Sequence, residues 1–380
     1  MSHTVSRLLA EAELEPQNAQ PRAETRYINF ANTNENLGLN NLLQELLLLS
    51  EVARQSHRAL VLRPFQLDEG TMPPQVFFAG PITGGAFPEG DASPRAVSMR
   101  TWERECPPSE VYYVRVAAVD AIAGLSETGD GIQVLEGWAR WLGDLDQRCV
   151  EIAHAEPSVF DFPLLISSRV ISIWPTISSS PLTTAFRWSS IVAGAVEKGV
   201  RLIGAPATSN GVFETLAALH IRRGDFGRHC QILEDETYSY NTWNLLPSLP
   251  DGFDPQANQT HENYQRHCWP TMETILLRIE DATRGRGIQQ LYILSNSNDQ
   301  WLAQLVAKLR QGGWDKVLTS HEMKPLLVDE ETLVDTAVDM EIARRAKLFI
   351  GNGFSSVTSN IVMLRLAMDN GSDPSSIRFW

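Results

Sequence analysis

Short apolar segments separated by polar turns open the patterned part of the sequence. Residues 26–31 alternate along a β-forming run and predict a strand. Residues 39–54 are rich in leucine and other helix formers, so they predict a helix packed on a sheet. Residues 59–62 predict a second strand, which ends before Pro64. Strand, turn, helix and strand within about forty residues are typical of the βαβ unit of a parallel sheet.

The middle of the chain has a weaker pattern. Residues 66–110 carry many prolines and glycines and are predicted to form a long loop. Residues 111–118 predict another strand, and residues 131–146 and 188–199 predict helices.

A second alternation of strands and helices begins near residue 200. A polar, aromatic segment, residues 227–268, interrupts it after the first strand. The predicted strands are residues 215–221, 290–295, 316–320 and 347–350, and the predicted helices are residues 271–284, 298–311, 338–346 and 356–366.

Both halves therefore predict α/β structure with a parallel sheet. We expect a flexible tail at residues 1–23 and two Rossmann-like domains, residues 24–200 and 201–380, facing each other across a cleft. No internal repeat is found. The length of 380 residues agrees with two domains of about 100–200 residues each.

Charge narrows the classes of partner. The net charge of −14 argues against a protein that coats nucleic acid or acidic lipid, although a small basic pocket stays possible. The longest apolar runs, such as residues 46–49, are far too short to span a bilayer, so no membrane segment is expected. The first 20 residues lack the apolar core of a signal peptide. The compartment stays open: cytoplasmic for the sequence as given, or the ER or Golgi lumen if a leader was removed.

Four cysteines are too few and too scattered to predict a disulfide scaffold, and no Cys/His cluster indicates zinc. Cys230 and Cys268 bracket one loop-like segment and could pair. Buried free thiols explain them equally well.

Ligands of open parallel sheets bind beyond the carboxyl ends of the strands, so unusual residues at strand ends are candidate site residues. The first such segment, residues 32–41, contains a turn glycine, Gly38, and an amide, Asn40, at a predicted helix start. Free N–H groups there can bind an anion. Taken alone, the segment is better explained as a helix cap after a glycine turn.

The second segment is HIRRGDF, residues 220–226, at the end of a buried strand. Alternation places His220 and Arg222 on one face of that strand. A guanidinium at a strand end suits bidentate phosphate recognition, so Arg222 and Arg223 are candidates to face a phosphorylated ligand. A solvated charge pair is the alternative, and burial of the preceding strand argues against it.

The third segment is FIGNGFSSVT, residues 349–358, in which two glycines precede a hydroxyl-rich helix start. This arrangement predicts a second anion-binding turn. Ser356 replaces the third glycine of a dinucleotide-binding fingerprint, and the chain ends 24 residues later, so NAD binding is a poor interpretation.

These segments together resemble the GDP-fucose protein O-fucosyltransferase superfamily, especially its fungal members. The matches are RYINF, LGLNNLLQE and ALVLRPF near the start, HIRRGDF in the middle and FIGNGFSSVTSNIVMLR near the end. They are collinear and span residues 26–365. The resemblance implies a GT-B fold and an inverting transfer of fucose from GDP-fucose that needs no metal ion or other cofactor.

The resemblance also implies roles for individual residues. Arg222 matches the essential arginine of the family's HxR motif, and His220 would line the donor site beside it. Asp339 matches the acidic residue that pairs with guanine. Gly38 and Asn40 match the turn near the diphosphate. Ser355 and Ser356 match hydroxyls that contact the phosphates, and Val357 stands where an aromatic residue often occurs.

The general base is the least defined part of the resemblance. Some members carry a glutamate immediately before the turn glycine, where this chain has Leu37. Glu35 is the nearest candidate, and a solvated turn glutamate explains it equally well. Asp225 is a further candidate, better explained by a role in its turn.

The favoured function is transfer of fucose to a hydroxyl acceptor, with protein Ser/Thr as the first candidate. Two alternatives remain: a GDP-sugar-dependent transferase acting on a glycan or small metabolite, and a non-catalytic protein that binds a GDP-sugar. The sequence does not identify the acceptor.

Overall fold

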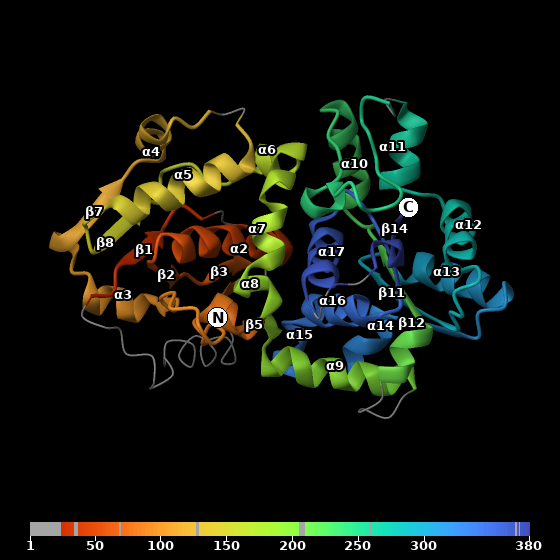
Figure 1. Cartoon of the computed structure of the whole chain (residues 1–380). Coiled ribbons are helices and arrows are strands. Elements are labelled where there is room, and N and C mark those ends of the chain that lie inside the picture. The colour runs from red at the N-terminus through yellow and green to blue at the C-terminus, as the bar shows by residue number, and fades with distance from the viewer. Residues whose placement is uncertain are drawn as a thin grey trace. The chain divides into compact units, whose positions relative to one another are not determined.

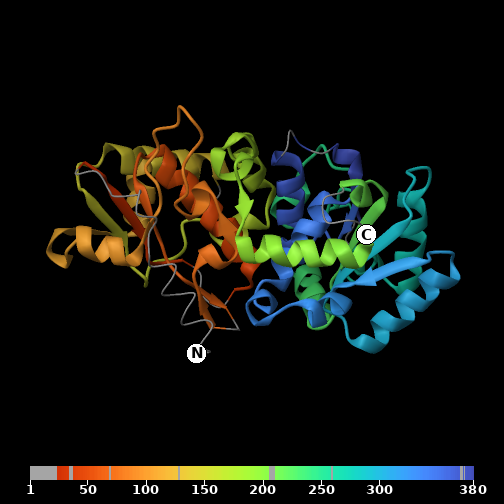
Figure 2. The ribbon, with the colours of Figure 1, turned by 90° about the horizontal axis from the view of Figure 1, so that it is seen from below.

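The computed structural model describes most of the chain. The described residues are 24–33, 37–67, 70–126, 129–204, 210–257, 260–368, 371 and 373–380. The predicted tail, residues 1–23, and the candidate base Glu35 lie outside them. Contacts divide the chain into two compact units, Met1–Leu165 with Arg169–Ile191, and Ile166–Ser168 with Val192–Trp380. The sequence passes from the first unit to the second within one helix, α9 (Ser190–Ile203), drawn yellow-green in Figure 2.

The first unit is built on a five-stranded sheet in the order β6-β2-β1-β8-β7, and all its strand pairs are parallel. Helices α2 and α5 pack side by side against it (Figure 1). The strands are β1 (Tyr27–Phe30), β2 (Ala59–Leu62), β6 (Val97–Ser98), β7 (Val111–Val114) and β8 (Cys149–Ile152). The helices are α2 (Leu39–Gln55), α3 (Met99–Glu105), α4 (Val116–Ala123), α5 (Gly131–Asp144), α6 (Phe162–Leu165), α7 (Trp174–Ser179) and α8 (Pro181–Thr184).

Two small antiparallel ribbons complete the first unit. They are β3 (Phe65–Leu67) with β4 (Gly70–Met72), and β5 (Phe78–Ala79) with β9 (Arg187–Trp188).

The second unit has its own five-stranded parallel sheet, in the order β12-β11-β10-β13-β14. This is the Rossmann order 3-2-1-4-5, and its direction of winding reverses between β10 and β13. The strands are β10 (Leu216–Ile221), β11 (Gln290–Ser295), β12 (Lys316–Thr319), β13 (Leu348–Gly351) and β14 (Ile377–Phe379). The helices are α10 (Phe226–Asp235), α11 (His261–Cys268), α12 (Met272–Thr283), α13 (Asp299–Gln311), α14 (Ser320–Met323), α15 (Asp329–Thr332), α16 (Asp335–Arg345) and α17 (Ser356–Ala367).

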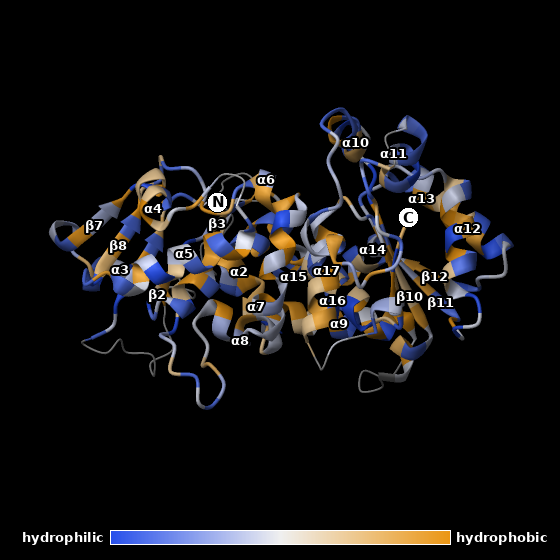
Figure 3. Cartoon of the chain, turned by 45° about the horizontal axis from the view of Figure 1, so that its top comes forward, coloured by the Kyte–Doolittle hydropathy of each residue, from blue (hydrophilic) through white to orange (hydrophobic). Residues whose placement is uncertain are grey.

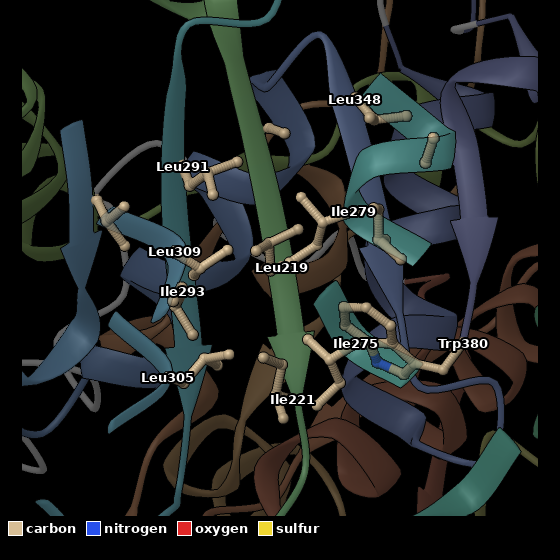
Figure 4. Packing of buried hydrophobic residues seen from close by; sticks show 14 of the residues in the cluster. Leu219, Ile221, Ile275, Ile279, Leu291, Ile293, Leu305, Leu309, Leu348 and Trp380 are labelled. Carbon is tan, nitrogen blue, oxygen red and sulfur yellow. The ribbon is translucent and has the colours of Figure 1, made fainter. Parts of the chain in front are cut away.

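Strand β10 is buried along its whole length, and its two faces have different partners. Ala217, Leu219 and Ile221 share a hydrophobic core with α12 and α13 (Figure 4). The even-numbered residues point to the opposite face, where His220 contacts Thr358 of α17. Figure 3 shows hydrophobic colouring along β10 and hydrophilic colouring on α11 at the edge of the unit. The two-residue period thus separates the core face from a face that carries polar groups.

Each unit contains a buried arginine that binds the carbonyl groups at the end of a helix. Arg58 donates to the carbonyl oxygens of Leu142 and Leu145 at the end of α5 at 2.8 Å. Arg365 donates from α17 to the carbonyl oxygens of Ala343 and Ala346 at the end of α16, at 2.8 and 2.6 Å. Burial lowers the pKa of Arg58 to about 10 and that of Arg365 to about 9, so both stay charged near neutral pH. These charges satisfy carbonyls that have no partner within their helix.

All four cysteines form disulfides, Cys106–Cys149 in the first unit and Cys230–Cys268 in the second. The second pairing was one of two open interpretations of the sequence, and the structure favours it. The first was not anticipated, because 43 residues separate its cysteines along the chain. Parallel pairing of β7 with β8 brings them together, since Val111 lies opposite Cys149.

Most predicted elements agree with the structure, and two differ. Residues 66–110 are more than a loop, because they contain β6, an edge strand of the five-stranded sheet, and helix α3. The predicted strand 111–118 ends at Val114, where α4 begins at Val116. Val116 and Val119 are buried three residues apart, which is a helical spacing that the β-branched composition conceals. Among the described residues, none of the helices has the length and apolarity needed to cross a membrane.

The Arg365 contacts give a stability prediction. We expect Arg365→Met to lower the free energy of unfolding by about 3 kcal/mol, because it leaves several buried carbonyls without donors. Urea denaturation followed by circular dichroism would measure the loss. Arg201→Met is the matched control, because Arg201 is 63% exposed and its ion pair with Glu197, at 3.7 Å, is also exposed. Equal stability of the two variants would contradict the proposed role of Arg365.

Candidate functional site

The second unit has a pocket of about 410 Å³ at the carboxyl ends of β10, β11 and β12. This is the edge of a parallel sheet at which ligands are expected. The lining residues combine apolar side chains with hydroxyls, amides and charged groups. They are His220, Arg222, Leu294, Ser295, Asn296, Ser297, Ser320, His321, Met323, Lys324, Leu327, Asp335, Thr336, Val338, Asp339 and Val357.

Arg222 follows directly after β10, and its guanidinium lines the pocket. One nitrogen, Nη2, lies 3.4 Å from Asp225 Oδ1, and the guanidinium lies 4.9 Å from the centre of the Phe226 ring. Asp225 also accepts a hydrogen bond from Asn296 at 3.2 Å, which supports a role for Asp225 in fixing the turn. Burial lowers the pKa of Arg222, but an arginine stays cationic in proteins. Arg222 therefore brings a partly desolvated positive charge to the pocket, with its side chain held on two sides.

His220 is buried at the end of β10 and also lines the pocket. Its Nδ1 lies 2.7 Å from the hydroxyl of Thr358, and its carbonyl oxygen accepts a bond from the Trp380 indole at 2.8 Å. Burial, and then the nearby charge of Arg222, lowers the pKa of His220 to about 3. The ring is therefore neutral at physiological pH and adds no second charge beside Arg222.

Asp339 enters the pocket from α16. Its Oδ1 accepts a hydrogen bond from the hydroxyl of Tyr292 at 2.5 Å. Burial raises the pKa of Asp339 to about 8, and Asp335 adds to this effect. The bond from Tyr292 and the charge of Lys324 act in the opposite direction. The carboxyl is thus mostly neutral near pH 7 and becomes ionised as the pH passes about 8.

The segment after β13 places three more predicted residues. Val357 lines the pocket, Ser355 precedes α17 as a buried residue and Ser356 begins that helix. Neither serine is among the described residues that line the pocket.

The neighbouring glycines, Gly351 and Gly353, are explained by close packing. A Cβ on Gly351 would lie 2.5 Å from Thr358, and a Cβ on Gly353 would lie 2.5 Å from the ring of Tyr240. Packing of the core therefore requires glycine at both positions, independently of any ligand that the turn binds.

The remaining predicted residues belong to the first unit. Gly38 is the N-cap of α2 in an extended conformation, and an added Cβ would meet no atom of the described residues within 4 Å. Asn40 is buried in the first turn of α2. The turn follows β1, which lies beside β8 where the winding of this sheet reverses.

Arg223 differs from its neighbour and corrects the expectation that both arginines face a ligand. Its guanidinium lies 4.5 Å from the ring centre of Trp269 and 4.4 Å from that of Trp301. It also donates to the carbonyl oxygen of Pro270. Alternation after the strand sends Arg223 to the face opposite Arg222, where it packs under the loop that carries Trp269.

Most of the pocket residues were missed in the sequence, and four of them lie just beyond strands. Asn296 and Ser297 follow β11, and His321 and Lys324 lie just beyond β12. The hydroxyl of Ser297 is buried and has no hydrogen-bond partner among the described residues. The rule that identified Arg222, polar residues after a buried strand, applies to these residues too. Their segments contain no motif that would have drawn attention to them.

Metal binding has no candidate cluster in the described part of the chain. No group of three or more His, Cys, Asp or Glu side chains there is placed to hold an ion. Residues 144–146, Asp-Leu-Asp, have the spelling of a metal-binding DxD motif, but they lie at the exposed end of α5.

Comparison with known proteins gives the family and the fold of the chain. The family model described as GDP-fucose protein O-fucosyltransferase matches residues 177–368. The chain belongs to this family. The match includes the HIRRGDF and FIGNGFSSVT segments, so the resemblance that they indicated is confirmed.

Solved structures agree on the fold. A crystal structure of POFUT1 in complex with GDP matches with a TM-score of 0.60 and 16% identity, over 94% of this chain and 99% of that one. POFUT1 in complex with GDP-fucose matches with a TM-score of 0.59 and 16% identity, over 95% and 99%. The predicted α/β fold of the GT-B type is thereby confirmed. A search among curated proteins found no significant match.

The contrast between the two arginines gives a prediction. We expect Arg223→Ala to lower the free energy of unfolding by about 3 kcal/mol, because it removes two cation–π contacts and a buried hydrogen bond. Arg222→Ala should cost less than about 1 kcal/mol, since its side chain borders an open pocket. Thermal unfolding of both variants would measure this. A larger loss for Arg222→Ala than for Arg223→Ala would show that the assignment is reversed.

Proposed function

We propose that the protein transfers fucose from GDP-fucose to a hydroxyl group of an acceptor, with inversion at the anomeric carbon and without a metal ion. The observation that carries the proposal is the pocket of the second unit, which combines the cation of Arg222 with the carboxyl of Asp339. Membership in the GDP-fucose protein O-fucosyltransferase family supports the choice of donor. POFUT1, which shares the fold, has been crystallised with GDP-fucose.

We assign the base end of the pocket to Asp339. An ionised carboxyl accepts two hydrogen bonds, which matches the N1–H and 2-amino donors of guanine. The raised pKa means that binding of guanine would favour the ionised form and release a proton near neutral pH.

We assign the diphosphate to Arg222 and the start of α17. A guanidinium can donate two parallel hydrogen bonds to phosphate oxygens. The first turn of α17 offers free N–H groups, and Ser355 and Ser356 lie there with hydroxyls. Neutral His220 and Val357 would line the donor beside them. Gly38 and Asn40 stay candidates for donor contacts on the family resemblance alone.

The transfer requires one bond to form and one to break. The acceptor oxygen attacks the anomeric carbon of fucose from the face opposite GDP, and the bond from that carbon to the β-phosphate oxygen breaks. The electron pair goes to the departing GDP, and the positive charge of Arg222 stabilises it. In this scheme Arg222 supplies the charge that a divalent cation supplies in other transferases. The acceptor proton passes to a base, for which Glu35 is our candidate.

The acceptor and the compartment are proposed from the family name and from the disulfides. The family name supports a hydroxyl of protein Ser/Thr as acceptor. The two disulfides support a secretory compartment, since disulfides persist in oxidising environments.

The first test is activity of Arg222→Ala. We expect the rate of GDP release from GDP-fucose to fall by roughly two orders of magnitude, which corresponds to about 3 kcal/mol of transition-state stabilisation. A coupled assay for GDP, with folding checked by circular dichroism, would measure it. Arg228→Ala is the control, because Arg228 is exposed on α10. Unchanged activity in Arg222→Ala would argue against this chemistry, and absence of donor turnover in a wild-type protein that binds GDP would favour a non-catalytic binding protein.

The second test concerns the metal ion and the donor sugar. We expect the same rate with EDTA and with added Mg²⁺ or Mn²⁺, because Arg222 supplies the charge on the leaving group. A metal-dependent transferase assayed in parallel would verify that the chelator is effective. Loss of activity with EDTA would refute the metal-free mechanism. Faster turnover of GDP-mannose than of GDP-fucose would refute the assignment of fucose.

A further inference from the structure

The side chain of Tyr292 has one polar group, its hydroxyl, and this hydroxyl contacts the carboxyl of Asp339 in the wall of the pocket. The residue lies on β11 opposite Ala218 of β10, and its side chain is fully buried. It therefore shares the face of the sheet that His220 occupies on β10. Its hydroxyl donates to Asp339 Oδ1 at 2.5 Å. A buried hydroxyl bonded to an ionisable side chain at a pocket edge favours one form of that side chain.

Other charged groups act on the same carboxyl. Asp335 lies one turn earlier on α16 and raises the pKa of Asp339. Lys324, from the short turn after α14, lowers it and lies 3.5 Å from Asp335. Burial, and then the charge of Asp339, raises the pKa of the Tyr292 phenol, and Glu322 of α14 adds to this effect. The other titratable groups that line the pocket are His220, Arg222 and His321. Of the groups named, Tyr292 is the one that donates a hydrogen bond to Asp339.

The form of this carboxyl decides which base it can recognise. An ionised carboxylate only accepts, whereas a neutral carboxyl presents one donor and one acceptor. Guanine offers two neighbouring donors, N1–H and the 2-amino group. Adenine offers an acceptor, N1, beside a donor, the 6-amino group. The carboxylate therefore fits guanine, and the neutral acid fits adenine.

We propose that Tyr292 is a positioning residue that favours the ionised, double-acceptor form of Asp339 and thereby increases the selectivity of the pocket for guanosine over adenosine diphosphates. The proposal rests on the assignment of this pocket to GDP-fucose. It adds a residue that contacts neither the base nor the phosphates and acts only through Asp339. Tyr292→Phe removes the donor and keeps the buried ring.

The first experiment needs no ligand. Asp side chains are labelled with ¹³C at Cγ, and the Asp339 signal is assigned by its disappearance in Asp339→Asn. We expect Tyr292→Phe to raise the proton affinity of Asp339 about tenfold, because a charge-assisted hydrogen bond to the ionised form is lost. Tyr264→Phe is the matched control, since its buried hydroxyl donates to the Tyr238 carbonyl at 3.0 Å away from the pocket lining. Identical titration in wild type and Tyr292→Phe would overturn the proposal.

The second experiment measures GDP and ADP binding by calorimetry at about pH 7 and about pH 8.5, where the N1–H donor of guanine is still in place. Because the ionised form binds guanine, GDP affinity should rise as the pH passes the pKa of about 8. We expect Tyr292→Phe to weaken GDP binding about tenfold near pH 7, with part of the loss recovered at the higher pH. ADP binding should not weaken, so the preference for GDP shrinks.

The outcomes separate this inference from the proposed function. Loss of GDP and ADP affinity by the same factor at both pH values would indicate a packing defect and overturn the inference. Equal GDP affinity of wild type and Tyr292→Phe near pH 7 would overturn it while leaving the proposed function intact. A folded wild-type protein that binds no GDP at either pH would overturn both.

Discussion

The central strand β10 constrains everything else in the second unit. It is paired on both edges and buried on both faces, so its side chains can contact a ligand only at the end of the strand. Its odd-numbered residues fill the core against α12 and α13, and its even-numbered side faces α17. His220 reaches the pocket from within the strand, and Arg222 reaches it because it continues this alternation just past the strand's end. A shift of one residue would exchange Arg222 with Arg223 and leave the pocket without its cation.

Electrostatics in the pocket is arranged by burial more than by the total charge. The chain carries −14, yet Arg222 is partly desolvated beside a histidine that burial and Arg222 keep neutral. On α16, burial raises the pKa of the Asp339 carboxyl, and the hydrogen bond from the Tyr292 hydroxyl lowers it in part. Arg365 fixes the end of the same helix through its carbonyl groups. The ionisable groups of the pocket thus depend on buried partners that no ligand would touch.

Much of the second unit could be predicted from the sequence. Strand β11 begins and ends where its apolar run does, and the polar residues after β10 correctly indicated a pocket edge. The failures have local causes. Strand β6 has two residues, too few to show a period, and β14 is a three-residue strand near the end. Lys324 and Tyr292 were missed because spacing along the chain carries no sign of a contact made across elements. Assignment of roles to Ser355 and Ser356 stays a prediction, as does that of Glu35.

The Cys230–Cys268 bond closes a segment that combines buried and exposed parts. Its middle is anchored, since Tyr240 packs on Gly353 and Trp243 is buried, whereas residues 254–257 and 260–262 are largely exposed. A covalent closure limits how far changes in the exposed part can disturb α10 and Arg222. Such a segment can accumulate substitutions and insertions between fixed ends while the fold persists. It is therefore a place where related proteins could diverge in what they recognise without risking the machinery that they share.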